Sequence, residues 1–164
     1  MPVLNSDKCF SNKSSVILQG FYFNFFLKVI QQKEIRLPPF TKGYHLIDNI
    51  IVDAFDLLPE TGILHLFLKH TSAGLMLNEN ADPDVRADLN TLFNNIAPEG
   101  APFYTHTLEG RDDMPAHFKT AIVGSSLTIP ITAHRVNTGT WQGIYLCEFR
   151  NHGGRRNIVA TVFS

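Results

Sequence analysis

Cysteine is scarce in this chain, with only Cys9 and Cys147 among its 164 residues. Two thiols cannot build the disulfide framework of a small secreted domain, so a reducing, cytoplasmic compartment is the simpler expectation. Cys147 alternates with apolar neighbours and is expected to be a buried thiol. A chain of this length can bury a hydrophobic core within one domain and needs no such cross-links.

An excess of charge of one sign is also lacking, because 14 basic and 15 acidic residues leave a formal net charge of −1. A general nucleic-acid binder needs a basic face that displaces counterions, so this balance argues against nucleic acid as a partner. A small anionic substrate remains compatible with the composition, since two or three arginines suffice to bind it. The glycine-rich nucleotide-binding loops and the G-x-S-x-G motif of hydrolases do not occur either.

No apolar run is long enough to predict a membrane span, although residues 16–30 come closest. Lysines precede this stretch as they do in a signal peptide, and secretion is therefore the alternative to a cytoplasmic location. However, Gln19, Asn24 and Lys28 interrupt the stretch, and no small-residue cleavage site follows it. We interpret residues 1–30 as a partly disordered N-terminal extension that leads into a single domain over residues 31–164.

Short strands outnumber helices in the remaining sequence. Alternating or β-branched apolar residues predict strands over 32–37, 44–52, 63–70, 127–132, 141–150 and 157–163. Gly153 and Gly154 make the last two strands a hairpin candidate, and we expect Trp141 to pack in the core. Because the predicted helices lie between strand runs, we expect an α+β fold with antiparallel, sandwich-like sheets and two main helices packed on one side.

The stronger helix prediction covers residues 83–96. Asp82 suits the N-cap and Pro83 the first helical position. Apolar residues recur at helical spacing and are expected to form its buried stripe, namely Val85, Leu89, Leu92 and Ile96. A shorter helix is expected over 115–123, capped by Asp113 or Met114, with an apolar side formed by Met114, Phe118, Ala121 and Ile122.

Three histidines in polar, turn-rich motifs are the main candidates for chemistry. His70 opens HTSAG, His106 lies in YTHTLEG and His117 closes DDMPAH. Imidazole binds zinc and also transfers protons near neutral pH, so a shared site would be a metal centre or a catalytic one. The spacing matches no local zinc signature. The alternative is that one or two of these histidines only form hydrogen bonds in a polar core.

Glu148 is a fourth candidate, as a metal ligand or a general base. It shares a face of its predicted strand with Ile144 and Leu146, where a buried carboxylate is costly without a partner. We therefore expect an arginine, a histidine or a metal ion beside Glu148.

Further polar residues are candidates for binding substrate: Asn78, Asp113, Arg150 and Arg155. Helix capping explains Asp82 but leaves Asn78 unexplained. Of Asp112 and Asp113, one is expected to cap a helix and the other to orient a histidine. The arginines from 150 to 156 cluster around a Gly-Gly turn, and arginine clamps phosphate through two parallel hydrogen bonds. The alternative is that they are solvated residues at strand ends.

Five motifs, in this order, resemble those of the YjbQ family, whose members are also called secondary thiamine-phosphate synthases: HTSAGLMLNENADPDV, YTHTLEG, DDMPAH, SLTIPIT and GTWQGIYLCEFR. The resemblance covers residues 32–164. It implies a compact α+β fold with antiparallel sheets and a homotrimer. It also implies a cleft that is a candidate site for a divalent metal ion, with zinc first among the candidates, lined by His70, His106, His117 and Glu148.

The activity attributed to this family couples a hydroxymethylpyrimidine diphosphate with a thiazole phosphate and releases pyrophosphate. The resemblance therefore suggests a transferase with a small phosphorylated metabolite as substrate. The alternatives are a non-catalytic trimeric binder of a metal or such a metabolite, and a metal-dependent hydrolase. One departure from the family pattern places Ala133-His134 where Asn-Gly is usual, and histidine adopts a positive φ less readily than glycine.

Overall fold

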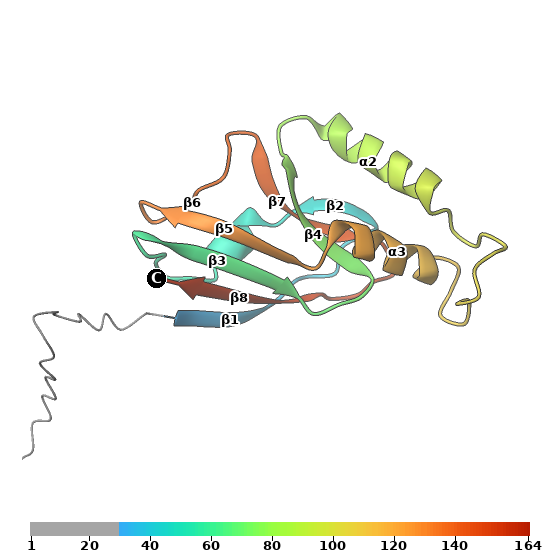
Figure 1. Ribbon diagram of the computed structural model, residues 1–164, viewed down its shortest axis with the longest axis horizontal. Coiled ribbons are helices and arrows are strands. Elements are labelled where there is room, and N and C mark those ends of the chain that lie inside the picture. Colours follow the sequence, from blue (N-terminus) through green and yellow to red (C-terminus); the bar gives the residue numbers. More distant parts are fainter. Residues whose placement is uncertain (1–29) are drawn as a thin grey trace, which may run out of the picture.

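The computed structural model describes residues 30–164, so the expectation of a partly disordered extension lies outside the described residues except at Ile30, where the first strand begins. Within the described range, eight strands and three helices form two antiparallel sheets and their covering layer (Figure 1). The expected α+β class is confirmed. No helix in residues 30–164 is both long enough and apolar enough to cross a membrane.

The larger sheet has the strand order β1-β8-β3-β5-β6. Its strands are β1 (Ile30–Arg36), β3 (Thr61–Leu68), β5 (Ser126–Thr132), β6 (Arg135–Val136) and β8 (Asn157–Phe163). The smaller sheet has the order β2-β7-β4, with β2 (Gly43–Leu46), β4 (Ala73–Glu79) and β7 (Gln142–Glu148). The helices are α1 (Asp48–Val52), α2 (Pro83–Ile96) and α3 (Asp113–Val123).

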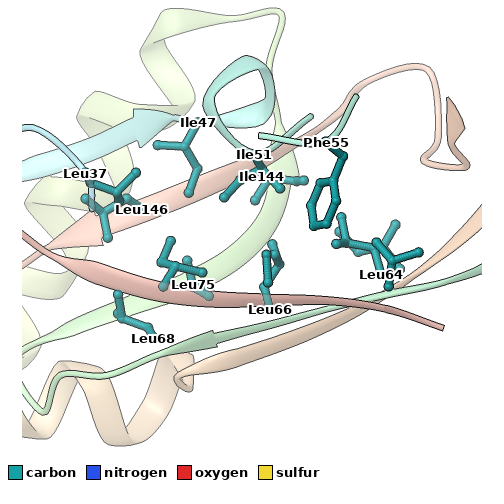
Figure 2. Packing of buried hydrophobic residues seen from close by; sticks show 14 of the residues in the cluster. Leu37, Ile47, Ile51, Phe55, Leu64, Leu66, Leu68, Leu75, Ile144 and Leu146 are labelled. Carbon is teal, nitrogen blue, oxygen red and sulfur yellow. The ribbon is translucent and has the colours of Figure 1, made fainter. Parts of the chain in front are cut away.

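The main core lies between the two sheets (Figure 2). Leu64, Leu66 and Leu68 enter it from β3, as the alternation of that strand predicts, and each is at most 1% exposed. The facing sheet contributes apolar residues from β4 and β7, namely Leu75, Ile144 and Leu146. Burial of these aliphatic side chains supplies the main driving force for joining the sheets.

A second hydrophobic cluster covers the other face of the smaller sheet. Tyr145, Cys147 and Phe149 alternate with the core residues of β7 and pack against Ala116 of α3 and Leu89 of α2. The two main helices therefore lie on one side, as expected. Cys147 is fully buried, and desolvation raises the pKa of its thiol.

The predicted hairpin around Gly153-Gly154 is wrong. β7 pairs with β2 and β4, whereas β8 pairs with β1 and β3, so this turn connects the two sheets. Both edges of β7 are already occupied, which leaves no edge to which β8 could add. Trp141 lies just before β7 and is 65% exposed, so its expected core packing is also wrong.

Residues 44–52 do not form one extended segment, because β2 ends at Leu46 and α1 begins at Asp48. The Asp48 carboxylate accepts a hydrogen bond of 3.0 Å from the Ile144 N–H, which fixes the start of this short helix against β7. The run of isoleucines is therefore accommodated by a helical turn that buries Ile51.

Helix α2 has the predicted bounds, and Asp82 caps it by accepting a 2.9 Å hydrogen bond from the Asp84 N–H. Its apolar stripe is not buried in the described chain, since Leu92 is 56% exposed and Ile96 61%. Only the partly buried residues of the helix reach the smaller sheet, through Leu89 and Phe93. The hydrophobic pattern thus identified the helix, but of its stripe Leu89 packs against this chain whereas Leu92 and Ile96 are exposed.

Helix α3 begins at Asp113, and Asp112 takes the N-cap position without a side-chain capping bond. The expected cap at Asp113 or Met114 is therefore wrong. The predicted apolar side is also largely outward, since Phe118 and Ile122 are exposed. The buried residues of α3 are instead those that pack on β4 and the loops around it: Asp113, Pro115, Ala116, Lys119 and Thr120.

The Ala133-His134 loop joins β5 to β6 with both residues at positive φ, of 50° and 63°. A two-residue loop with this sign pattern is typical of type I′ hairpins, where Asn-Gly is preferred. The His134 Nδ1–H donates to the Leu58 carbonyl oxygen at 2.9 Å. This bond holds His134 at a positive φ, which histidine adopts less readily than glycine. It also keeps the His134 ring apart from His70, His106 and His117.

Candidate metal centre

His106, Asp113 and His117 converge at the start of α3. The spacing of four residues places Asp113 and His117 on one helix face, and the preceding loop brings in His106. Asp113 Oδ2 lies 2.7 Å from His106 Nε2 and 3.1 Å from His117 Nε2. One ligand atom from each residue lies within 4.8 Å of the others, so the three could hold a metal ion.

Asp113 supplies the negative charge of this group although its side chain is 1% exposed. Burial raises the pKa of a carboxyl group, but the hydrogen bond from His106 and the charge of Arg150 outweigh burial, so the pKa of Asp113 is lowered. Arg150 Nη1 pairs with Oδ1. The other oxygen is therefore directed at the two imidazoles.

The tautomer of His117 follows from its neighbours. Its Nδ1 lies 2.8 Å from the carbonyl oxygen of Thr71, which can only accept, so Nδ1 carries a proton. In neutral His117 the Nε2 atom then presents a lone pair to the ionised Asp113. This contact is favourable only with a cation between the two atoms or a second proton on the ring. An Nδ1–H bound to a backbone carbonyl is the usual support of a histidine metal ligand.

Arg150 is a positioning residue of this centre. Its Nε donates to Asp112 Oδ2 at 3.0 Å and its Nη2 to the Glu109 carbonyl at 2.8 Å, in addition to the pair with Asp113. The Asn151 N–H also donates to Asp112, at 2.8 Å. Because its guanidinium is engaged on every side, Arg150 holds the carboxylates in place and has little capacity left for a substrate phosphate.

His70 is not brought into the group of His106, Asp113 and His117. It lies just beyond β3, and its Nε2 accepts a 2.8 Å hydrogen bond from the Asn157 N–H. That lone pair is therefore unavailable to a metal ion. Desolvation, followed by the charge of Arg156, lowers the pKa of His70. The next residue, Thr71, fixes His117 through its carbonyl, so His70 adjoins the centre only through the backbone.

Glu148 lies in a separate polar cluster with His70 and Arg156. Its fully buried carboxylate accepts from Arg156 Nε at 2.7 Å and from Arg156 Nη2 at 2.6 Å, and from the Arg150 N–H at 2.9 Å. Arg156 is therefore the partner that we expected for a carboxylate on the apolar face of this strand. A Cβ at Gly153 would overlap this ion pair, so the glycine at that turn is required by close approach.

The remaining predicted residues, Asn78 and Arg155, lie apart from the centre. Asn78 Oδ1 accepts from the Glu79 N–H at 2.7 Å, and its Nδ2 contacts the Met76 sulfur at 3.9 Å. Strand β4 begins at Ala73, two residues after Thr71, whose carbonyl oxygen contacts His117. Asn78 lies five residues further along this strand, or about 16 Å of extended chain. Arg155 is exposed and has no hydrogen bond or ion pair within residues 30–164.

A cavity of about 380 Å³ lies at the Gly153-Gly154 turn, and a smaller one of about 260 Å³ adjoins the centre itself. His106 lines the smaller cavity together with Tyr104, Thr107, Gly110 and Arg111. The sequence reasoning did not single out Arg111. The signal that could have identified the centre is the DDMPAH motif, which places a carboxylate and an imidazole one helical turn apart.

The chain resembles known proteins over nearly all of its described length. Residues 33–164 match the family model described as "UPF0047 protein YjbQ-like". The UPF0047 protein YjbQ of Salmonella typhimurium is 50% identical over 133 residues, which cover 80% of this chain and 96% of the relative. The UPF0047 protein YjbQ of Escherichia coli O157:H7 is 46% identical over the same shares of both chains.

Solved structures agree with the fold. A YjbQ/UPF0047 protein of Clostridium acetobutylicum superposes with a TM-score of 0.68 at 34% identity, covering 80% of this chain and 99% of that one. A conserved hypothetical protein of Thermus thermophilus gives a TM-score of 0.69 at 32% identity, covering 79% and 97%. These descriptions name a family and no reaction. On the match of motifs, overall sequence and fold, the chain belongs to the YjbQ (UPF0047) family.

Proposed function

We propose that this chain is a divalent-metal-dependent enzyme that acts on a small phosphorylated metabolite. The observation that carries the proposal is the convergence of His106 Nε2 and His117 Nε2 on Oδ2 of the buried, ionised Asp113. Since Nδ1 of His117 is already bonded to the Thr71 carbonyl oxygen, either a metal ion or a second proton on the ring makes this contact favourable, and the proposal assigns a metal ion. The side chains of His106 and His117 are 44% and 32% exposed, which leaves the centre accessible to a ligand.

The donor set suits zinc, which binds imidazole nitrogen and carboxylate oxygen and, in catalytic sites, has three protein ligands. His106, Asp113 and His117 would hold the ion, which would polarise a phosphoryl oxygen and stabilise a departing anion. Arg150 keeps Asp113 ionised and oriented. Thr71 keeps His117 in the tautomer that can bind a metal.

The reaction we propose first, on the resemblance of the sequence motifs, is a transfer in which the ring nitrogen of a thiazole phosphate displaces pyrophosphate from a hydroxymethylpyrimidine diphosphate. A metal-dependent hydrolase is the second candidate, because two histidines and one carboxylate leave positions open for water. A trimeric binder without turnover is the third. We further propose a cytoplasmic location, in keeping with the low cysteine content.

Metal binding tests the proposal most directly. The metal-free full chain is titrated with zinc in competition with a chromophoric chelator. We expect one zinc ion per chain, and His106→Ala should weaken binding at least about 100-fold, since even outer-shell changes cost up to that much. His152→Ala removes an exposed histidine outside the centre and is the matched control. Equal zinc affinity in both variants would contradict the proposal.

Product analysis separates the three candidate functions. Pyrophosphate release that requires both thiamine precursors and stops with chelator identifies the transferase. Release of phosphate from one substrate and water identifies the hydrolase. Zinc binding without turnover on a panel of phosphate esters and diphosphates identifies the binder and removes the enzymatic part of the proposal.

We also propose that the chain is a homotrimer. Support comes from the apolar residues that α2, α3 and the loop between them expose in a single chain: Leu92, Ile96, Phe103, Leu108, Phe118 and Ile122. In Figure 1, α2 lies at the outer margin of the molecule. Large apolar side chains left exposed on neighbouring elements are typical of a protein–protein interface.

Sedimentation velocity tests the assembly. We expect the wild type to sediment as a trimer and Ile96→Glu, which places a charge in this surface, to sediment as a monomer. Leu57→Glu is the matched control, because Leu57 is 65% exposed but lies in the loop before β3. A monomeric wild type, or loss of assembly only with Leu57→Glu, would overturn the trimer.

A further inference from the structure

The guanidinium of Arg111 has no hydrogen bond or ion pair within residues 30–164, although it adjoins the candidate metal centre. Its backbone carbonyl accepts a 3.0 Å hydrogen bond from the Gly100 N–H, which joins the two ends of the α2–α3 connection. The acids that follow it in sequence, Asp112 and Asp113, are already paired with Arg150. Arg111 therefore retains its full capacity to bind an anion.

The backbone at Gly100 is shaped to receive this side chain. Gly100 has a φ of 63°, and a Cβ built there would overlap the Nε, Nη2 and Cζ atoms of Arg111. The guanidinium accordingly lies directly against the glycine backbone.

Arg111 and His106 line the same cavity of about 260 Å³. Tyr104 and Thr107 contribute hydroxyl-bearing side chains to the same wall. A ligand in this cavity can therefore meet a candidate metal ligand together with a guanidinium that has no partner among residues 30–164. Arg150 is unsuited to this task because its donors are used, and Arg155 is not among the residues that line the cavity.

We propose that Arg111 is the residue that binds the phosphate group of the substrate, in the cavity beside His106. The planar fork of a guanidinium presents two parallel donors that match two phosphate oxygens. The proposal deepens the proposed function by assigning its substrate class to one residue. Phosphate binding at Arg111 can be measured without metal, so the Arg111 assignment and the proposed metal-dependent function can fail independently.

The test is a titration of the metal-free full chain with inorganic phosphate, followed by the amide NMR shifts of Gly100, Thr107 and Gly110. We expect saturable shifts at these positions in the wild type and at least tenfold weaker binding in Arg111→Gln. Arg155→Gln removes the same charge from another exposed arginine that has no partner in the described part of the chain, and it should change the affinity less than twofold. Equal losses of phosphate affinity in the two variants would overturn the proposal, and so would amide shifts confined to residues outside this cavity.

Two further arms sharpen the result. Acetate is titrated in the same way, and acetate binding at Arg111 as tight as phosphate binding would overturn the phosphate assignment. Zinc titration of Arg111→Gln should give the wild-type affinity, because the Arg111 guanidinium forms no hydrogen bond or ion pair with His106, Asp113 or His117. If the wild type binds phosphate at Arg111 but no zinc, the proposed function fails and the Arg111 assignment stands. If the wild type binds zinc but no phosphate, the Arg111 assignment fails and the metal centre of the proposed function stands.

Discussion

Two clusters in this molecule use the same kinds of side chain. They differ in whether each charged or hydrogen-bonding atom meets a complementary partner. In the cluster of His70, Glu148 and Arg156, the carboxylate is fully buried and paired in a bidentate fashion with the arginine. In the cluster of His106, Asp113 and His117, two imidazole nitrogens and a carboxylate oxygen face one another at the surface of α3. The first cluster is closed, whereas the second is open to an added cation.

The difference teaches that residue type alone does not identify a functional site. His70 and His117 are both histidines in polar motifs, yet a backbone N–H occupies the lone pair of His70, whereas a backbone carbonyl leaves that of His117 exposed to Asp113. The direction of one backbone hydrogen bond therefore decides which imidazole can act as a ligand. The following variants test this division, from the largest expected effect to the smallest.

Arg156→Met tests the closed cluster. It leaves Glu148 buried without its counter-charge, and loss of one partner of a buried ion pair typically costs about 3–5 kcal/mol. We expect urea unfolding to show a fall in the free energy of unfolding of this size. Arg155→Met, an exposed neighbour, should stay within about 0.5 kcal/mol of the wild type. Similar stability of the two variants would show that the ion pair does not hold the sheets at this point.

Asp113→Asn tests the open cluster. The amide keeps the size of the side chain but removes the charge that a cation would meet, so we expect zinc affinity to fall about 100-fold, or about 3 kcal/mol. Zinc competition titration measures the loss, and circular dichroism checks that the fold is retained. Unchanged zinc affinity would mean that the metal, if bound, uses other ligands.

Lys119→Met compares an unpaired buried charge with the paired charge of Glu148. Lys119 is 1% exposed, and among the described residues its Nζ donates only to the neutral Asn94 Oδ1, at 2.7 Å. Desolvation, followed by the charge of Lys42, lowers the pKa of Lys119 to about 8. Between pH 8 and the unfolded value near 10.5, the unfolded chain keeps a proton that the folded chain has lost, so stability rises with pH in this window.

Methionine abolishes this titration at the same position. We expect Lys119→Met to be more stable than the wild type at pH 7 by about 2–3 kcal/mol, and the difference to narrow toward about pH 10.5. Urea unfolding at several pH values measures it. A constant difference across that window would show that Lys119 stays charged in the folded protein.

His70→Gln has the smallest expected effect and tests whether His70 is structural. At about pH 7 the loss of its hydrogen bond with the Asn157 N–H should cost about 1 kcal/mol. Since the pKa of His70 is lowered in the folded chain, the unfolded chain takes up the proton first, and wild-type stability should fall relative to the variant as pH drops below 6.5. Zinc affinity should change less than twofold; a large loss would move His70 into the open cluster.

Local signals predicted much of the fold. Asp82 and Pro83 marked the start of α2, and the leucines of β3 marked its buried face, because capping and alternation depend on neighbouring residues. The hairpin at Gly153-Gly154 could not be judged in this way, since strand pairing depends on which sheet edges are free. The outward apolar sides of α2 and α3 were missed for a related reason: periodicity identifies an apolar face but not what covers it.

The sequence by itself determined the family, the α+β class, and the need for a partner beside Glu148, because motif order, hydrophobic periodicity and the cost of a buried charge are local properties. Only the tertiary structure decided that Arg156 is that partner and that His117 joins Asp113 and His106. It also decided that Arg150 is occupied while Arg111 is unpaired within residues 30–164. These outcomes depend on hydrogen bonds between residues distant in the chain, whose geometry is fixed only when the sheets and helices pack together.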